Sequence, residues 1–370
     1  MATVVIRKSS YDYNTLRPAF FELMNTIGGS LITPDTRVLI KPNLLSPATP
    51  QQAVLTHPHI VKATVEYVLH RGAHPQVSDS PAMGSFEKIL KISGIGDAVK
   101  ESDVICKEFE RSASIDIGEP FRTIEIAEDA INADIVINLP KLKTHSQMLL
   151  TLGVKNMFGC IIGYRKPEWH LRTGVNRALF AKLLVLTYQR INPSFTILDG
   201  ILAMEGEGPG SGGIPRALGV LIGSRDAHAV DSTVCRMLRL DPERLLTVKI
   251  ARDMGLIDDK IEIVGHLPKI TDFKFPVVVP LVYGPRILHG FIRKHLLQRP
   301  VCDNNTCRAC EECINICPAG AISLPAKMIR FDYNRCIRCY CCIEVCPYGA
   351  LHASESFAGR FVRRAIARYF

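Results

Sequence analysis

The sequence lacks any long, uninterrupted apolar run. A transmembrane helix needs roughly 18 consecutive apolar residues, and no segment of this 370-residue chain reaches that length. The N-terminal segment MATVVIRKSS has no apolar core of the kind found in export signals, and its pattern is typical of a strand. We therefore expect a protein without a membrane span that works in the cytoplasm.

Motifs for binding nucleic acid are also missing, although the chain is basic. The formal net charge is +9, and residues 291–370 hold 12 Lys and Arg residues against 6 Asp and Glu residues. The same region contains a cysteine-rich segment whose thiolates are negative. Compensation of that negative charge explains the basic excess, so no nucleic-acid partner is expected.

Cysteine, by contrast, is abundant, and most of the 13 cysteines are regularly spaced. Two runs follow the pattern C-x₂-C-x₂-C-x₃-C, and each is followed by proline. Zinc sites usually take separate C-x₂-C pairs, whereas this spacing is that of ferredoxins with two clusters. The two runs consist of Cys307, Cys310, Cys313 and Cys317, and of Cys336, Cys339, Cys342 and Cys346.

In the two-cluster arrangement, the fourth cysteine of each run binds the other cluster. One [4Fe–4S] cluster would be held by Cys307, Cys310, Cys313 and Cys346. The second would be held by Cys336, Cys339, Cys342 and Cys317. A zinc site and a disulfide framework are the alternatives, and both fit eight cysteines at this spacing less well. The sequence predicts two [4Fe–4S] clusters, which favour a reducing compartment.

The two cysteine runs form an internal repeat. The segment CRACEECINICPAGAIS aligns residue for residue with CIRCYCCIEVCPYGALH. Cys302 and Cys341 fall outside the pattern and are interpreted as small buried residues, with a spare-ligand role as the alternative. Apolar residues that recur around the ligands should form a dry shell, namely Ile314, Ile316, Ile322, Ile337, Ile343, Val345 and Leu351.

Residues 1–270 alternate apolar strand-like runs with helical patterns. This alternation predicts an α/β domain with a parallel or mixed sheet, followed by a small α+β domain of the bacterial-ferredoxin kind. Helices are expected at 15–24, 60–70, 178–189, 230–238 and 245–254, with another beginning at 86–90. Strands are expected at 4–6, 38–40, 104–109, 135–139, 195–198, 218–222 and 261–264, and a short one from residue 77.

Polar motifs follow several of these predicted strands. Loops at the carboxyl edge of an α/β sheet are where ligands usually bind. The motifs are KPN at 41–43, SDSP at 78–81, PKLKTH at 140–145, GVKNMFGC at 153–160, DG at 199–200 and MEGEGPG at 204–210.

The segments IKPN, THP, SDSP, LPKLKTH, GVKNMFG and DGI…MEGEGPG occur in this order. Together they resemble the family known as domain of unknown function 362. The resemblance covers about residues 36–235, and some members of that family carry a ferredoxin-like module, as this chain does. It implies no activity for individual residues.

Gly208-x-Gly210-x-x-Gly213 matches the dinucleotide-binding pattern G-x-G-x-x-G. That fingerprint requires a strand directly before it and a helix directly after it. Here acidic residues precede it, and Ile214-Pro215 and a β-like run follow. We predict a loop between two strands, which could close over a ligand, in place of a nucleotide site.

Lysine is concentrated in the strand-end motifs. Lys155 lies in an otherwise apolar run bounded by glycines, where a buried charge needs a partner. A cluster of such lysines would bind phosphate or carboxylate, and a solvated basic edge is the alternative. The predicted substrate-binding residues are Lys41, Asn43, Lys141, Lys143, Lys155 and Asn156. The candidates for catalysis are Asp79, Lys143, His145 and Lys155, and no single one is favoured.

Other polar residues are weaker candidates. His57 could donate a proton, although a lone histidine in a loop is more often structural. Cys160 could be a nucleophile, but no histidine is adjacent in sequence, so a buried structural role is favoured, as for Cys106 and Cys235. Three carboxylates could bind a metal or act as acid and base, namely Glu205, Glu207 and Asp231.

The predicted domains are an α/β domain at 1–270, a linker with an amphipathic helix at 271–300, a ferredoxin-like domain at 301–353 and a basic amphipathic tail at 354–370. Prolines 276, 280 and 285 interrupt the linker, so one long helix is excluded there. A basic amphipathic tail can contact an anionic membrane, and packing on the chain's own domains is the alternative.

These features lead to three functional hypotheses. The first is an iron–sulfur oxidoreductase in which the clusters exchange electrons with a substrate in the α/β domain. The second is an electron carrier whose large domain docks a partner, and the third is a non-redox enzyme with structural clusters. Fusion of the two domains favours the first, because it makes electron delivery intramolecular. Since no nicotinamide or flavin motif is evident, we expect an electron-donor or electron-acceptor protein as a partner.

Overall fold

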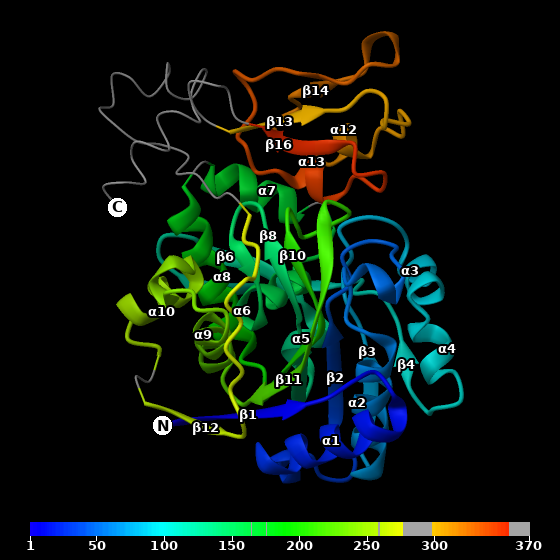
Figure 1. Ribbon diagram of the computed structural model, residues 1–370, viewed down its shortest axis with the longest axis vertical. Coiled ribbons are helices and arrows are strands. Elements are labelled where there is room, and N and C mark those ends of the chain that lie inside the picture. The colour runs from blue at the N-terminus through cyan, green and yellow to red at the C-terminus, as the bar shows by residue number, and fades with distance from the viewer. Residues whose placement is uncertain (164, 175, 258–259, 277–297, 355–370) are drawn as a thin grey trace.

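A computed structural model describes residues 1–163, 165–174, 176–257, 260–276 and 298–354. Most of the predicted linker with its amphipathic helix, and nearly all of the predicted tail, lie outside these residues. Figure 1 shows an α/β domain with the cysteine-rich module, drawn in orange and red, at one end. The predicted fold class is confirmed.

A ten-stranded mixed sheet forms the centre of the α/β domain. Its main path has the order β12-β1-β11-β10-β7-β2-β3-β4, and β8 and β9 extend it beside β10. Most neighbours are parallel, whereas β11 runs antiparallel to β1 and β10. The strands are β1 (Ala2–Lys8), β2 (Arg37–Pro42), β3 (His74–Val77), β4 (Ile105–Cys106), β7 (Ile135–Leu139), β8 (Lys141–His145), β9 (Leu149–Thr151), β10 (Phe195–Gly206), β11 (Gly213–Ser224) and β12 (Ile261–Val264).

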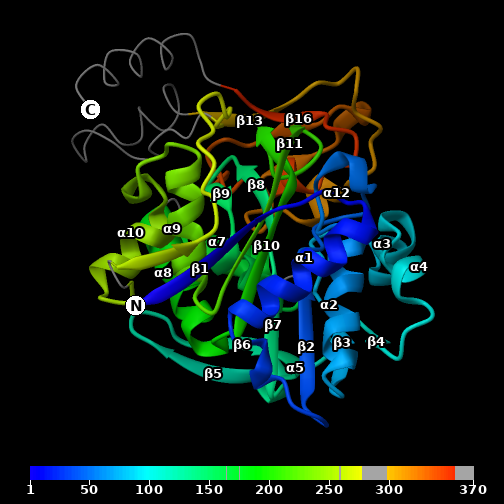
Figure 2. The same ribbon diagram turned by 60° about the horizontal axis from the view of Figure 1, so that its bottom comes forward.

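Helices cover both faces of this sheet (Figures 1 and 2). Alternation along β2 shows why: Val38 and Ile40 pack into one apolar cluster, and Leu39 packs into another. The first face is covered by α1 (Tyr13–Thr26), α2 (Pro58–His70), α3 (Phe86–Ser93) and α4 (Ile95–Val99). Elements on the second face include α5 (Glu128–Asn132), α6 (Gly153–Asn156), α8 (Arg177–Ile191), α9 (Ala227–Met237) and α10 (Leu246–Asp253).

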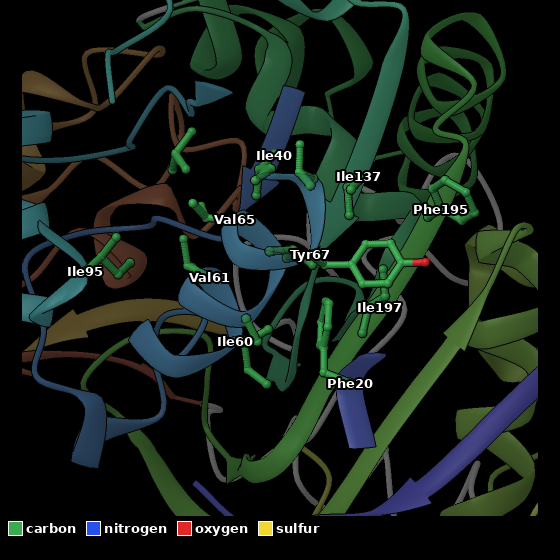
Figure 3. Close-up of a cluster of buried hydrophobic side chains, with 14 of the residues drawn as sticks. Phe20, Ile40, Ile60, Val61, Val65, Tyr67, Ile95, Ile137, Phe195 and Ile197 are labelled. Carbon is green, nitrogen blue, oxygen red and sulfur yellow. The ribbon is translucent and has the colours of Figure 1, made fainter. Parts of the chain in front are cut away.

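The core of the first face is shown in Figure 3. Phe20 of α1 and Tyr67 of α2 lie against the sheet there, and both are buried. Burial of each large apolar side chain contributes roughly 1.5–3 kcal/mol. The labelled residues that join them are Ile40, Ile60, Val61, Val65, Ile95, Ile137, Phe195 and Ile197.

Local signals set the ends of the helices that were predicted well. The His57 side chain accepts a hydrogen bond from the His59 N–H at the start of α2, and Pro58 occupies its first position. After this helix ends, Gly72 has φ of +74°, which is the left-handed conformation that glycine adopts readily. The helix predicted at 60–70 thus ends two residues before this glycine.

Several polar segments predicted as loops are strands instead. Lys141–His145 forms β8, which pairs in parallel with β10 and antiparallel with β9. Asp199, Gly200 and residues 204–206 lie inside β10, which is longer than predicted because β11 pairs along its whole length. These segments were predicted as loops because they contain charged residues. Such residues can be buried in a strand only when other elements supply partners for their charges. A hairpin of β5 (Ser112–Gly118) and β6 (Arg122–Ala127) was also missed.

The cysteine-rich module has two small sheets and two short helices. Strand β13 begins at Arg299, within the predicted linker, and pairs with β16. The elements are β13 (Arg299–Cys302), α12 (Glu312–Asn315), β14 (Ile322–Ser323), β15 (Arg330–Phe331), α13 (Cys341–Glu344) and β16 (Leu351–Ser354). The remaining helices are α7 (Arg165–Thr173) and 3₁₀ turns at Gly29–Leu31, Pro50–Gln52, Met157–Cys160, Pro242–Arg244 and Pro325–Lys327. Among the described residues, no helix is long and apolar enough to cross a membrane.

Candidate active site between the two domains

The cysteines of the module line two small cavities. Cys317 of the first run lies in one cavity with Cys336, Cys339 and Cys342 of the second run. Cys346 of the second run lies in the other with Cys307, Cys310 and Cys313, and Cys302 also lines that cavity. Each cavity thus gathers one of the two crossed sets of four thiols. Apolar side chains, among them Ile322 and Phe331, also line the first cavity, and Ile329 and Leu351 line the second. Four thiols within an apolar shell fit a [4Fe–4S] cluster in each cavity.

A larger cavity of about 280 Å³ lies where the module meets the α/β domain. The α/β domain contributes three lysines, Lys41, Lys155 and Lys166, together with Asn43 and Asp79. The module contributes Glu312, Asn315, Ile316, Cys341, Glu344 and Val345. Apolar residues, including Leu44, Leu45, Met83 and Phe158, line the rest. Three lysines and three carboxylates therefore line this cavity, and much of its remaining wall is apolar.

An ion pair forms part of the α/β wall. Lys41 Nζ lies 2.8 Å from Asp79 Oδ1, and both side chains are buried. Asp79 also accepts hydrogen bonds from the backbone N–H groups of Leu44 and Ser80. Burial raises the pKa of Asp79, and the charge of Lys41 opposes that rise. Because the pair is satisfied internally, its role is to shape the wall.

Gly159, the last residue of the motif GVKNMFG, lies directly against the ion pair of Lys41 and Asp79. A Cβ at this position would lie 2.4 Å from both Asp79 Oδ1 and Lys41 Nζ. Contacts that short do not occur between non-bonded atoms, so a side chain here would displace the ion pair. The glycine thus keeps the Lys41–Asp79 pair intact at the cavity wall.

A chain of side-chain amides fixes the orientation of Asn43. The Asn138 amide donates to the Gly153 carbonyl, Asn156 donates to Asn138 Oδ1, and Asn43 donates to Asn156 Oδ1, with the last two distances both 2.8 Å. A backbone carbonyl can only accept, so the direction of every bond in the chain is determined. The Oδ1 atom of Asn43 is left without a protein partner among the described residues.

Lys155 has no hydrogen bond or ion pair within the part of the chain that the structure describes. Burial lowers its pKa, and the nearby Glu344 carboxylate opposes that shift. Lys166 differs, since its amine donates to Ser80 Oγ at 3.0 Å and to the Ser80 and Pro81 carbonyls. Burial lowers the pKa of Lys166 to about 8. Lys155 thus presents an amine without a hydrogen-bonded counterion at the cavity wall, which makes it a candidate binding site for an anion.

Lys143 and His145 lie behind the cavity wall. Both side chains are buried on one face of β8, and the amine of Lys143 donates to the Val54 carbonyl at 2.8 Å. Burial, together with the charge of Lys155, lowers the pKa of Lys143 to about 7. His145 Nε2 lies 3.0 Å from Glu344 Oε1, and its Nδ1 accepts from two backbone N–H groups. His145 thus connects the sheet to helix α13 of the module.

The glycine-rich loop after β10 also holds the module in place. Ser211 Oγ donates to the Cys346 carbonyl at 3.0 Å. A Cβ on Gly210 would lie 2.9 Å from the Glu344 carbonyl oxygen, so the close approach requires glycine. The loop lies between β10 and β11, as predicted. Strand β11 follows these glycines, where the dinucleotide fingerprint would require a helix.

Some predicted residues lie away from the cavity. Lys141 forms an ion pair with Asp199 at 2.8 Å and donates to the Tyr11 hydroxyl, so its charge is satisfied internally. His57 stacks on Tyr11, and burial lowers its pKa to about 4. Cys160 is buried, and its pKa is raised to about 12.

The three carboxylate candidates are not gathered into one site. Glu205 accepts from the Lys274 N–H, whereas Asp231 accepts from the backbone N–H groups of Gly153 and Val154 at the start of α6. In the described ranges, no three His, Cys, Asp or Glu side chains are grouped to hold a single metal ion. Glu205 and Asp231 thus bind backbone N–H groups at separate positions.

Four cavity residues were not anticipated from the sequence. Lys166 and His170 belong to α7, which follows no predicted strand. Glu344 and Cys341 belong to the cysteine repeat; Cys341 was interpreted as a small buried residue or spare ligand, and Glu344 was not considered. For Lys166, the one signal in the sequence was its position shortly after the motif GVKNMFGC.

The fold and these cavities define an α/β protein with an appended iron–sulfur module. Two family comparisons agree with this description. Residues 38–236 match the domain of unknown function DUF362. Residues 299–350 match a 4Fe-4S dicluster domain. The chain therefore belongs to the DUF362 family and carries a C-terminal region that binds [4Fe–4S] clusters.

Two individual proteins are similar to this chain. A thylakoid-associated protein of Synechocystis sp. is 35% identical over 303 residues, which are 78% of this chain and 94% of that protein. The lactate racemase apoprotein of Thermoanaerobacterium thermosaccharolyticum shares 12% identity over 61% of this chain and 55% of its own, with a TM-score of 0.40. A likeness at that level says nothing about the activity of this chain.

Proposed function

We propose that this protein is an iron–sulfur oxidoreductase that binds two [4Fe–4S] clusters and acts on a small anionic substrate in the 280 Å³ cavity. The observation that carries the proposal is the composition of the cavity wall. Helices α12 and α13 supply part of that wall, and the same helices contain the predicted ligands Cys313 and Cys342. Bound clusters would supply or accept single electrons within a short distance of the substrate.

The chain's own residues account for substrate binding. Lys155 would pair with the anionic group, with Lys166 beside it, since charge-assisted hydrogen bonds to anions are about twice as strong as neutral ones. The apolar walls would exclude water and strengthen that pairing. Lys143, with a pKa of about 7, suits storage of a proton behind Lys155 near neutral pH.

The same charges predict how anion binding depends on pH. The pKa values of Lys143 and Lys166 are about 7 and about 8, well below the ordinary value of 10.5. Both amines therefore lose their positive charge as the pH rises from about 7 to 9. Since sulfate keeps its charge over this range, its affinity, measured by calorimetry, should fall there and not near pH 10.5. Lys166→Arg should shift the fall to higher pH, and an affinity that stays constant to pH 10 would contradict the prediction.

The test of the proposed function begins with the ligand that copurifies under anaerobic conditions. It would be identified by mass spectrometry in wild-type protein and in Lys155→Ala. Protein reduced with dithionite and freed of excess reductant would then be mixed with that compound. We expect cluster absorbance to return to the oxidised form while the compound gains a matching number of electrons, and Lys155→Ala to slow this reaction strongly.

Two other outcomes would reject the oxidoreductase proposal. Reoxidation by a redox protein at the same rate with and without the compound would favour an electron carrier. Conversion of the compound with no change in its oxidation state, in protein whose clusters stay oxidised, would favour a non-redox enzyme.

We further propose a partner protein that exchanges electrons with the module, and a reducing cytoplasm as the location. Support for the location comes from the chemistry of thiolate ligands. Contact with a membrane surface also stays a proposal, since it was based on residues 355–370. The relative from Synechocystis is named as thylakoid-associated, which makes vesicles of anionic lipid a sensible probe.

A further inference from the structure

The two halves of the cysteine repeat differ in one buried charge. Ala309 and Arg338 occupy equivalent positions, each two residues after the first cysteine of its run. Both have a left-handed backbone, with φ of +52° and +58°. The N–H of Ala309 donates to Cys307 Sγ at 3.4 Å, and the N–H of Arg338 makes the same kind of bond to Cys336. The backbones of the two sites are thus alike, and the side chains differ.

Arg338 is buried inside the module. Only 1% of it is exposed, and its Nε donates to the Gln298 carbonyl at 3.2 Å. The Tyr340 hydroxyl donates to the same carbonyl at 2.9 Å and helps to hold the segment in place. A guanidinium keeps its charge at all ordinary pH values, so this position carries a fixed cation.

The two cysteine sets also differ in their burial and in the residues beside them. Cys336, Cys339 and Cys342 are all buried, whereas Cys310 is exposed. The residue equivalent to Tyr340 in the first run is the exposed, acidic Glu311. Glu344 lies between Cys342 and Cys346 and is therefore close to both sets. Arg308 lines the cavity of the other set, but it is exposed, so a buried cation lies beside one set only.

We propose that Arg338 raises the reduction potential of the cluster held by Cys336, Cys339, Cys342 and Cys317 and leaves that of the other cluster nearly unchanged. One-electron reduction adds one negative charge to a cluster and breaks no bond, so a neighbouring fixed cation stabilises the reduced form. The exclusion of water from the buried set disfavours the added negative charge and therefore lowers the reduction potential. The Coulomb attraction is stronger in the same water-poor surroundings, which is why the buried position makes the cation effective.

The inference rests on the proposed pair of clusters and does not depend on the identity of the substrate. It would be tested in anaerobically purified full-length protein by a dithionite titration monitored by electron paramagnetic resonance. Arg338→Gln removes the charge and keeps a hydrogen-bond donor, and Arg338→Lys keeps the charge. In Arg338→Gln we expect the ratio of reduced to oxidised form of one cluster to fall at least tenfold at fixed potential, which for one electron is about 59 mV. Arg338→Lys should stay close to wild type.

The repeat supplies a reciprocal variant. Ala309→Arg places the same charge beside the other set and should raise the potential of the second signal while leaving the first unchanged. Equal potentials in Arg338→Gln and wild type, or equal shifts of both signals, would overturn the proposal. It would also be overturned if every neutral variant lost iron while Arg338→Lys kept it, because the charge would then be needed for cluster assembly. Iron content and integrated spin show separately whether two clusters are present.

Discussion

Replacing Cys317 with alanine is expected to remove about half of the iron from anaerobically purified protein. Two [4Fe–4S] clusters correspond to about eight iron atoms per chain, so about four should remain in this variant. The cluster lost should be the one at Cys336, Cys339 and Cys342, because these residues line one cavity together with Cys317. Iron and acid-labile sulfide would be measured by colorimetric assay.

Double variants distinguish crossed from uncrossed ligands. If the sets are crossed, Cys317→Ala combined with Cys339→Ala affects a single cluster and leaves about four iron atoms. Cys317→Ala combined with Cys310→Ala affects both clusters and leaves almost none. Uncrossed sets would give the opposite pair of results. Cys302→Ala is the control, because Cys302 lies beside one cavity but outside the repeated pattern, so its iron content should match wild type.

The module was predicted well from the sequence because its information is local. Three closely spaced cysteines can bind one cluster only in a few ways, and the repeat of the run supplies the fourth ligand. The α/β domain was also predictable, since Val38 and Ile40 on one side and Leu39 on the other follow the ordinary alternation of a buried strand.

The positions of single polar residues depend on contacts between distant segments. Lys141 and Lys143 look equivalent in the motif PKLKTH, yet one is paired with Asp199 and the other donates to Val54 and lies near Lys155. Asp199 is 58 residues from Lys141 in the chain. No local pattern encodes that pairing. Lys166 was missed for a related reason, since a helix on the sheet's flank brings it to the cavity.

The second prediction concerns the cavity and compares Lys155, which lines it, with Lys141, which is buried elsewhere in the α/β domain. Lys155→Ala removes a charge-assisted contact to a bound anion, worth about 1.5–3 kcal/mol. Affinity for the copurifying anion, or for sulfate or acetate as probes, should fall roughly ten- to a hundredfold, as measured by calorimetry. Because the amine has no partner among the described residues, the free energy of unfolding should not fall. Lys143→Ala, farther from the cavity, is expected to weaken binding in the same direction.

Lys141→Ala is the matched control. It also removes a buried lysine from the α/β domain, but it leaves Asp199 without its ion-pair partner. Breaking a buried pair in this way costs about 3–5 kcal/mol of folding stability, so denaturant unfolding should shift strongly while the folded fraction binds anion as wild type does. Reversal of the two phenotypes would place the anion site at Lys141. Equal anion affinity in all three variants and wild type would mean that the lysines of the cavity serve only to hold the two domains together.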